Sequence, residues 1–571
     1  METKNCQNCQ KEFTIEESDF NFYEKISSAS GGAVPPPTWC PECRLIRRLS
    51  FPNTWSLFWR NCDKCKERTL SQYPPEDKTM VYCPKCWWGD SWDGTEYSLE
   101  YDPSRPFLEQ VKELSDKTPY VALETLYTSL KNSDYCNALS WCKDCYLIFY
   151  ADYCERVYYS SILRGAKDTI DSLRIFDSEL CYESIGLHKS YEVFYSQECD
   201  ACTNVWFSRN CYNCMNCVGC ANLRGESYCI FNEKYSKEDY AEKIKELNLQ
   251  SSAKLRGLLQ KAQYFWLTKP YRAYTGNTFN LNVTGEYVQN SKNSKNLYIC
   301  GYAENCKWTQ FITVKTAKDC YDYSGWGNNA TLMYESIQAG ENMNNIMFSY
   351  YCFPDCINLQ YCFWNTSGKN NFGCVNLKRK SYCILNKEYD KESFDKLRTR
   401  IIADMKTNPY VDKLGRKFGY GEFFPPEMSK FPYNKSNAMR FFPKTKEQAL
   451  AEGYAWSDRL DAVYEITLKA SSLPDTIEKT SETILQEVIG CASCGRGYKI
   501  AQGEFDLLRK LHLPVPHECP KCRENRRFSK LNPPKLYERN CAKCDKEIIT
   551  AFAPERPETV YCEKCYQGEF I

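Results

Sequence analysis

The sequence has very little histidine and no long apolar run. Only His188, His512 and His517 occur in 571 residues, and no two of them share a metal-binding or nucleophile motif. Gly-rich phosphate loops, the Gly-x-Ser-x-Gly elbow and the His-Glu-x-x-His motif are missing as well. With a mean hydropathy of -0.61, no segment predicts a membrane span. These absences weigh against the common enzyme classes, and we expect a protein that is not an enzyme.

The chain also lacks an excess of charge of either sign. It carries 74 Lys and Arg against 73 Asp and Glu. A nucleic-acid partner must therefore be argued from local patches rather than from the whole chain. The first residues, METKNCQNCQKEF, have no apolar stretch typical of a secretory signal. We therefore expect a cytoplasmic, reducing location, where thiols bind metal or lie buried more often than they form disulfides.

Cysteine, by contrast, is abundant, with 36 residues. Sixteen of them form Cys-x-x-Cys pairs near the two ends of the chain. Two intervening residues let a tight turn direct both thiolates at one ion, and a second such turn completes a tetrahedral site without an open position. We therefore predict about four structural Zn²⁺ ions, although thiolates also suit a rubredoxin-like iron site. The predicted ligands are Cys6, Cys9, Cys40, Cys43, Cys62, Cys65, Cys83, Cys86, Cys491, Cys494, Cys519, Cys522, Cys541, Cys544, Cys562 and Cys565.

The two terminal modules are copies of one another. Every cysteine from Cys40 to Cys86 maps onto a C-terminal cysteine by the same offset of 479 residues. Pro41, Arg44 and Tyr82 recur at that offset too. Such agreement indicates an internal duplication. The spacing leaves two pairings open, either sequential pairs or a cross-brace of first with third and second with fourth.

Basic residues follow the second cysteine pair of each module. The segment 40–66 has a local net charge of +4, and its counterpart 519–546 has +6. Arginines beside aromatic rings suit phosphate contact and base stacking. The alternative is that they lie on a solvated face or cap the zinc turns. The residues predicted to contact a polyanion are Arg44, Arg47, Arg48, Arg523, Arg526 and Arg527.

Between the modules lies a second repeat. The segment Cys220–Asn232, CANLRGESYCIFN, returns as CVNLKRKSYCILN at an offset of 154 residues. Short β-branched and aromatic runs precede each copy, starting every 9 to 15 residues and separated by Asn, Asp, Ser and Gly. This spacing predicts a mainly β protein with a duplicated β-solenoid-like core, and an antiparallel sandwich is the alternative. Helices are expected at 236–247, 252–266, 390–401 and after Thr445.

The remaining twenty cysteines are predicted to pack the core as small apolar side chains. One run, Cys211, Cys214, Cys217 and Cys220, is similar to a ferredoxin motif, but its last gap is one residue short and no proline follows. The sequence leaves open whether this run binds metal.

These patterns divide the chain into seven parts. Double zinc-ribbon modules are expected at 1–100 and 488–571, and cysteine-rich β-repeat domains at 131–235 and 291–386. Between them we expect a helical linker at 101–130, a helical connector at 236–290, and a helix with a Pro- and aromatic-rich wrapping segment at 387–487.

Several motifs together resemble a known family. CPECRLIRRLSF, VYCPKCWWGDSWD, GCANLRGESYCIFNEKYSKEDY and FFPPEMSKFPYNKSNAMRFFPK are similar to segments of zinc-ribbon-containing hypothetical proteins of uncultivated bacteria. The resemblance implies a cytoplasmic protein with zinc ribbons around a cysteine-rich core, and it implies no activity. From the residues we predict a non-enzymatic scaffold that binds nucleic acid or protein through basic zinc modules. The alternative is an intracellular β-solenoid enzyme acting on a carbohydrate.

Overall fold

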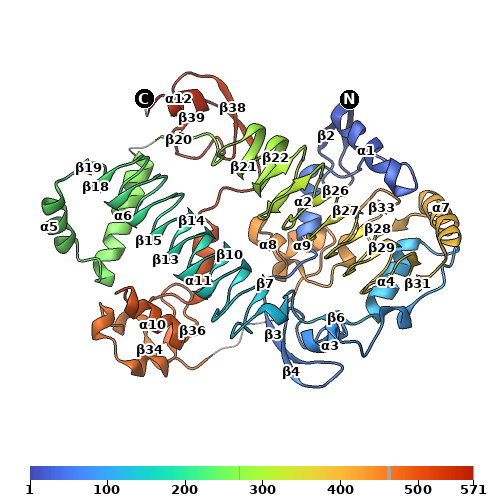
Figure 1. Cartoon of the computed structure of the whole chain (residues 1–571), viewed down its shortest axis with the longest axis horizontal. Coiled ribbons are helices and arrows are strands. Elements are labelled where there is room, and N and C mark those ends of the chain that lie inside the picture. Colours follow the sequence, from blue (N-terminus) through green and yellow to red (C-terminus); the bar gives the residue numbers. More distant parts are fainter. Residues whose placement is uncertain (269–270, 460–463, 570–571) are drawn as a thin grey trace.

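The computed structural model describes residues 1–268, 271–459 and 464–569. Two stacks of short strands lie side by side, with small modules and helices packed around them (Figure 1). Strands make up 29% of the chain and helices 25%, so strands outweigh helices only narrowly.

The first stack, formed by residues from about 131 to 235, contains two parallel sheets. Successive strands pair at a spacing of twelve residues, so that Ser161 lies between Phe149 and Leu173. One sheet contains β7 (Asn137–Ser140), β8 (Phe149–Asp152), β10 (Ser161–Arg164), β12 (Leu173–Phe176) and β14 (Ile185–His188). The other contains β9 (Glu155–Tyr158), β11 (Lys167–Ile170), β13 (Glu179–Tyr182), β15 (Tyr191–Phe194), β16 (Thr203–Trp206), β17 (Met215–Val218), β18 (Ser227–Ile230) and β19 (Glu233–Lys234).

A three-residue period explains these short strands. From Ala138 to Phe231, every third residue has a positive φ, which turns the chain after each short extended stretch. The residue two positions before each turn points inward, and most of these positions hold Cys, Ser, Val, Leu, Ile or Ala. Four turns therefore fit into each twelve-residue repeat, and the chain returns to pair in parallel with itself. This parallel pairing contradicts the antiparallel sandwich alternative.

The second stack, residues 281–388, follows the same plan less regularly. Its strands are β21 (Leu281–Gln289), β22 (Lys292–Gly301), β23 (Ala303–Glu304), β24 (Gln310–Ile312), β25 (Ala317–Lys318), β26 (Ala330–Tyr334), β27 (Met343–Met347), β28 (Ile357–Gln360), β29 (Lys369–Phe372), β30 (Cys383–Ile384) and β31 (Lys387–Glu388). Paired residues are twelve apart at Ile357 and Lys369 but thirteen apart at Ala317 and Ala330. The sheet begins at Leu281, ten residues before the start predicted at 291.

Small polar side chains complete the interior of the first stack. The hydroxyl of Ser184 accepts a hydrogen bond from the amide of Ser196 at 3.3 Å, and Ser196 does the same for Ser208 at 3.0 Å. Buried thiols donate to main-chain carbonyls in the same way, as Cys202 does to Cys211 at 3.4 Å. These serine and cysteine side chains thus have hydrogen-bond partners, which is what allows them to fill a core.

The expected helices are present, with small shifts at their ends. Ser236 caps α5 (Lys237–Leu247), and Asp390 caps α7 (Lys391–Thr407), which runs beyond the predicted end. The helix α6 (Ser252–Thr268) connects the two stacks. Thr445 and Gln448 form a capping box on α9 (Lys446–Ala451). These termini were predictable because a side-chain cap satisfies amides that the helix itself cannot bond.

The segment after α7 packs on the second stack as predicted. It contains β32 (Tyr410–Val411), β33 (Lys417–Phe418) and α8 (Ala438–Phe441). Phe424 is fully buried, with its ring 4.3 Å from that of Phe363. On the N-terminal side, α4 (Phe107–Lys117) lies in the predicted linker and packs against α7. In the described part of the chain, every helix is too short or too polar to cross a lipid bilayer.

Candidate metal centres

Four clusters of cysteine side chains lie at the two ends of the sequence. Within each cluster all four Sγ atoms are within 4.8 Å of one another. The clusters combine neighbouring pairs, so the sequential arrangement is the observed one and the cross-brace is not. They are Cys6, Cys9, Cys40 and Cys43; Cys62, Cys65, Cys83 and Cys86; Cys491, Cys494, Cys519 and Cys522; and Cys541, Cys544, Cys562 and Cys565.

All four clusters have the same construction. The first cysteine pair lies in the turn between two short antiparallel strands, and the second pair begins a helix. The strands are β1 (Glu2–Asn5) with β2 (Glu12–Ile15), β3 (Phe58–Asn61) with β4 (Arg68–Ser71), β35 (Ile489–Gly490) with β36 (Gly497–Tyr498), and β37 (Tyr537–Asn540) with β38 (Glu547–Thr550). The helices are α2 (Pro41–Leu49), α3 (Pro84–Trp88), α11 (Pro520–Phe528) and α12 (Glu563–Gln567).

The local sequence favours this construction. In each second pair the first cysteine is the residue before the helix, and in three of the four helices a proline follows it at the first helical position. Proline suits that position because its fixed φ matches the helix and its missing amide hydrogen would have no partner there. The next cysteine then lies on the first turn of the helix. Both thiols therefore point toward the first cysteine pair, in the turn between the two strands.

The spacing of the sulfur atoms fits a tetrahedral ion. Cys9 and Cys40 are 3.8 Å apart, and Cys544 and Cys562 are 3.7 Å apart. A tetrahedral centre with Zn–S bonds of about 2.3 Å has sulfur–sulfur edges of about 3.8 Å. The four-thiol donor set therefore fits a closed, structural metal site.

Main-chain amides support negative charge on the sulfur atoms. The amide of the helix-capping cysteine donates to the first cysteine at 3.2 Å in all four clusters, for example from Cys562 to Cys541. Burial raises the pKa of Cys541, but the amides of Cys562, Lys543 and Cys544 outweigh it and lower that pKa to about 6. Thiolates are the form that binds metal, so these amides favour the ligand state of the first cysteine.

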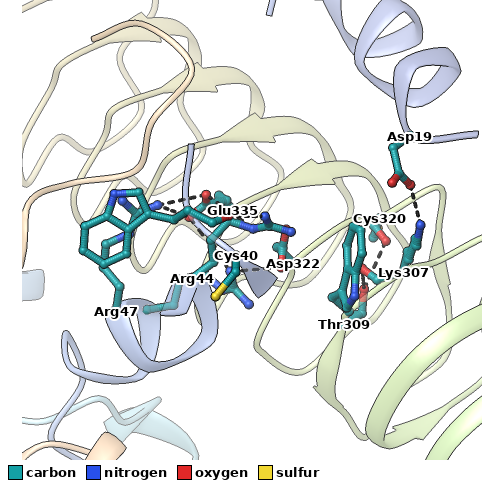
Figure 2. Close-up of polar contacts among 12 residues, drawn as sticks. Asp19, Cys40, Arg44, Arg47, Lys307, Thr309, Cys320, Asp322 and Glu335 are labelled. Atoms are coloured by element: carbon teal, nitrogen blue, oxygen red, sulfur yellow. Dashed lines mark hydrogen bonds and ion pairs between the residues drawn. The ribbon is translucent and has the colours of Figure 1, made fainter. Parts of the chain in front are cut away.

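The arginines of the N-terminal module lie under the second stack. Arg44, Arg47 and Arg48 project from α2 and are at most 1% exposed. Figure 2 shows Arg44 and Arg47 beside Asp322 and Glu335. Arg44 is 2.7 Å from Asp322, and Arg47 is 2.9 Å from Glu335. The indole ring of Trp39 covers the Arg47 guanidinium at 4.3 Å.

The C-terminal module repeats this contact on the first stack. From α11, Arg527 lies 3.0 Å from Asp171, and Arg523 contacts Asp171 as well. Arg526 is 3.0 Å from Glu183 and keeps 34% of its side chain exposed. Each module therefore docks on the stack that is farther from it in the sequence.

This placement corrects the polyanion prediction. Five of the six arginines, Arg44, Arg47, Arg48, Arg523 and Arg527, are buried and paired with carboxylates, so they do not face a partner. Their partners were missed in the sequence. Asp171 and Glu183 occupy turn positions one twelve-residue repeat apart, and Asp322 and Glu335 occupy turn positions thirteen residues apart. Acidic residues at equivalent turns of successive repeats were the signal that could have identified a docking surface.

The central cysteines are core residues. Cys211, Cys214, Cys217 and Cys220 are at most 1% exposed and fill the interior of the first stack, one on each short side of a single repeat. Each donates to a main-chain carbonyl two residues back, at 3.3 to 3.6 Å. Among the described residues, the four Sγ atoms of this run do not all lie within 4.8 Å of one another, unlike those of the terminal clusters. The structure thus places them as buried, hydrogen-bonded thiols.

A cleft of about 450 Å³ lies between the two stacks. The rings of Trp141 and Tyr153, twelve residues apart, are parallel to within 4° and 6.3 Å apart, and both are more than half exposed. Asp152 and Glu341 line the cleft from opposite stacks. Burial raises the pKa of both carboxyl groups, and the charge of Asp152 raises that of Glu341 further.

Comparison with known proteins adds no relative. No protein-family model, no curated protein and no solved structure matches this chain. The resemblance to zinc-ribbon-containing proteins of uncultivated bacteria therefore stays a prediction, and the function must be argued from the geometry.

Proposed function

We propose that this is a zinc-binding scaffold protein in which four structural Zn²⁺ ions hold two zinc-ribbon modules on a duplicated β-solenoid. The observation that carries this proposal is the repeated construction of the four Cys₄ clusters. A complete thiolate shell leaves no open position for water or substrate, so the ions act on stability rather than on chemistry.

Because each module docks on the stack that is farther from it in the sequence, the zinc ions stabilise the whole molecule and not only their own modules. Each first cluster orients a helix, α2 or α11, whose arginines reach buried carboxylates of the distant stack. Because the N-terminal module holds the second stack and the C-terminal module holds the first, the two solenoids are tied together from both ends of the chain. A rigid double solenoid of this kind suits the presentation of a large binding surface.

Metal analysis of the purified protein tests the zinc assignment. We expect four zinc ions per chain and no iron, and a large fall in melting temperature when a strong chelator removes them. Serine at Cys6, Cys62, Cys491 or Cys541 should each lower the content by one ion. Iron in place of zinc, or full occupancy after these substitutions, would contradict the proposal.

The partner that the scaffold binds is a nucleic acid or a protein. We assign its binding surface to the outer zinc knuckles, which are the Cys-x-x-Cys turns at Cys62–Cys65 and Cys541–Cys544. After the docked arginines are set aside, exposed cations remain there at Lys66, Arg68 and Lys546. Arg68 stacks over the partly exposed ring of Trp59 at 4.4 Å. A cation beside an exposed ring supports contact with phosphate and base.

A salt titration of RNA and DNA binding separates the two partners. If the knuckles bind a polyanion, affinity falls linearly with salt on a log–log plot. The double substitution Arg68→Gln with Lys546→Gln reduces that slope, whereas Lys234→Gln, at an exposed site on the first stack, leaves it unchanged. No binding at low salt would exclude the nucleic acid, and nuclease-resistant capture of a defined protein would favour the protein partner.

A second candidate is an enzyme acting on a carbohydrate, and the cleft between the stacks favours it. Two carboxyl groups with raised pKa, Asp152 and Glu341, resemble the acid and base pair that glycoside hydrolysis uses. The parallel rings of Trp141 and Tyr153 offer a platform for the apolar face of a sugar ring. Release of reducing sugar from an oligosaccharide panel, lost in Glu341→Gln but kept in Glu304→Gln, would establish this activity. Absence of turnover across the whole panel would exclude this activity.

A further inference from the structure

A separate cavity of about 340 Å³ lies where four parts of the chain meet. The first stack, the segment after α6, the second stack and the C-terminal zinc module all contribute to its lining. Arg174, Arg209, Arg224 and Arg272 line it, together with the carboxylates of Glu198, Asp200 and Glu286. None of these residues belongs to a cysteine cluster or to the cleft described above.

Arg272 is the unusual member of this set. It belongs to β20 (Arg272–Ala273), which pairs with β39 (Val560–Tyr561) of the C-terminal module. Its side chain is buried, with only 6% of the residue exposed. Nη2 donates to the carbonyl of Trp266 at 2.6 Å, but Nε and Nη1 have no hydrogen-bond partner among the described residues. A buried cation without a counter-charge costs several kcal/mol.

The nearby carboxylates do not supply that counter-charge. Glu198 is 3.1 Å from Arg174, and Asp200 is 3.2 Å from His188. Glu286 accepts hydrogen bonds from Asn532 at 2.7 Å and from the Gly276 amide at 3.2 Å. Burial raises the pKa of Glu286 to about 7, so its negative charge is weak near neutral pH. The charge of Glu558 acts on both Arg272 and Arg209, but this carboxylate forms its ion pair with Arg556. Each of these acids is therefore engaged or partly neutral.

A second cation lies close to Arg272. Burial lowers the pKa of Arg272 to about 9, and the charge of Arg209 is the next cause. No ion pair or side-chain hydrogen bond of Arg209 occurs among the described residues. Arg224, in contrast, is held by the carbonyl of Asn210 at 2.5 Å. Among the described residues neither guanidinium group forms an ion pair with a carboxylate, and both line one cavity.

We propose that this cavity binds the phosphate group of a small organic phosphate, with Arg272 and Arg209 as its cationic ligands. A phosphate dianion balances both guanidinium charges at once, whereas a carboxylate balances only one, and its oxygens accept from several N–H donors. Tyr212 and Phe279 also line the cavity, with 46% and 78% of their surfaces exposed. These rings are placed to cover the organic part of the ligand.

Calorimetric titration of the zinc-loaded protein with inorganic phosphate and with phenyl phosphate tests this site. Phenyl phosphate should bind more tightly than inorganic phosphate, because the rings cover its apolar part. Arg209→Gln and Arg272→Met should each weaken binding by about tenfold or more. Arg105→Gln, on an exposed arginine of the linker beside α4, is the matched control and should bind as the parent does.

A thermal readout separates a binding role from a purely structural one. If Arg272 is held for a ligand, Arg272→Met without phosphate melts no lower than the parent protein, and phosphate stabilises only the parent. Absence of phosphate and phenyl phosphate binding to the parent at millimolar concentration, or equal binding to all variants, overturns the proposal. Because zinc content is measured on the same samples, failure of the zinc scaffold is recognised independently.

Discussion

The contact of α2 with the second stack and the contact of α11 with the first stack use the same arginine pattern. They differ in how completely the arginines are shielded from solvent. At the N-terminal contact, Arg44, Arg47 and Arg48 are all inaccessible, and Glu422 of the wrapping segment adds a third carboxylate, 3.3 Å from Arg47. At the C-terminal contact the third carboxylate, Glu504, comes from α10 (Gln502–Lys510) of the same module, 3.0 Å from Arg523.

The exposure of Arg526 marks the same difference. Its side chain is 34% exposed and also reaches Glu518 at 3.0 Å, whereas the equivalent Arg47 is fully covered. A duplicated motif thus produced one contact sealed by a third segment and one contact that remains partly open to solvent. Because solvent screens charge, the two contacts should differ in strength even though their sequences match.

If the clusters hold zinc as proposed, loss of one ligand should give the largest effect. Cys43→Ser and Cys522→Ser each remove a ligand from the helix that carries the docking arginines, so the corresponding module should detach from its stack. Structural zinc contributes on the order of 10 kcal/mol, and we expect a fall in melting temperature well beyond that of any other single change. Zinc content and differential scanning calorimetry measure the outcome.

Cys43→Ser should lower the melting temperature more than Cys522→Ser, because three chain segments meet at the N-terminal docking contact. Cys181→Ser, at a buried thiol of the first stack, serves as the control and should keep all four ions. Equal melting temperatures for the two ligand variants would show that the third segment adds nothing.

Removal of one buried acid should give the next largest effect. Glu335→Gln leaves the three N-terminal arginines with less counter-charge and should cost about 3–5 kcal/mol of unfolding free energy, as for other broken buried ion pairs. Glu183→Gln should cost less, because Arg526 retains access to water and to Glu518. Chemical denaturation measures the loss of unfolding free energy in both variants. A larger loss for Glu183→Gln would refute the conclusion that the N-terminal contact is the more completely sealed one.

A buried acid without an arginine should make the free energy of unfolding fall as the pH rises. Glu124 is 2% exposed and accepts hydrogen bonds from Tyr350 at 3.0 Å and Gln338 at 2.9 Å. Burial raises its pKa to about 8. The folded state therefore keeps the proton while the unfolded state releases it, so stability falls as pH rises from about 4.5 to about 8.

Glu124→Gln should remove this fall, amounting to a few kcal/mol across that window. Melting temperatures recorded between pH 5 and 8.5 for the variant and the parent measure it. Glu427→Gln, at a carboxylate of the wrapping segment, is the control for general effects of losing a charge. A parallel pair of curves for Glu124→Gln and the parent would exclude a neutral Glu124.

The smallest expected effect belongs to Arg526. Arg526→Gln should lower the unfolding free energy by about 1 kcal/mol, close to the value for partly exposed ion pairs. High salt should reduce the difference further. Arg47→Gln, its sealed counterpart, should be several times more costly and nearly insensitive to salt, and the same denaturation series measures both.

The cysteine clusters were predictable from the sequence because the residues of each turn are local. A Cys-x-x-Cys turn determines its own geometry within four residues, and the caps at Ser236, Asp390 and Thr445 work over a single helical turn. The central repeat was predictable in its approximate spacing only. Its three-residue period of small or apolar inward residues is present in the sequence, for instance at Ser184, Leu187, Ser190 and Val193, but the irregular lengths of the predicted runs obscured it.

The role of the arginines required the tertiary structure. Arg47 and Glu335 are 288 residues apart, and nothing near either residue specifies the other. A cationic helix face can bind phosphate in solution or carboxylates in the interior with the same side chains, so composition alone does not distinguish the two.

By itself the sequence determined the local chemistry of this protein: four Cys-x-x-Cys turns at each end, capped helices, and a repeating chain with small side chains facing inward. Only the tertiary structure decided which stack each module meets, why its arginines are buried, and which cations of the described residues lack an ion-pair partner. The physical reason is that thiolate turns and helix caps depend on neighbouring residues, whereas the compensation of buried charge depends on residues that folding alone brings together.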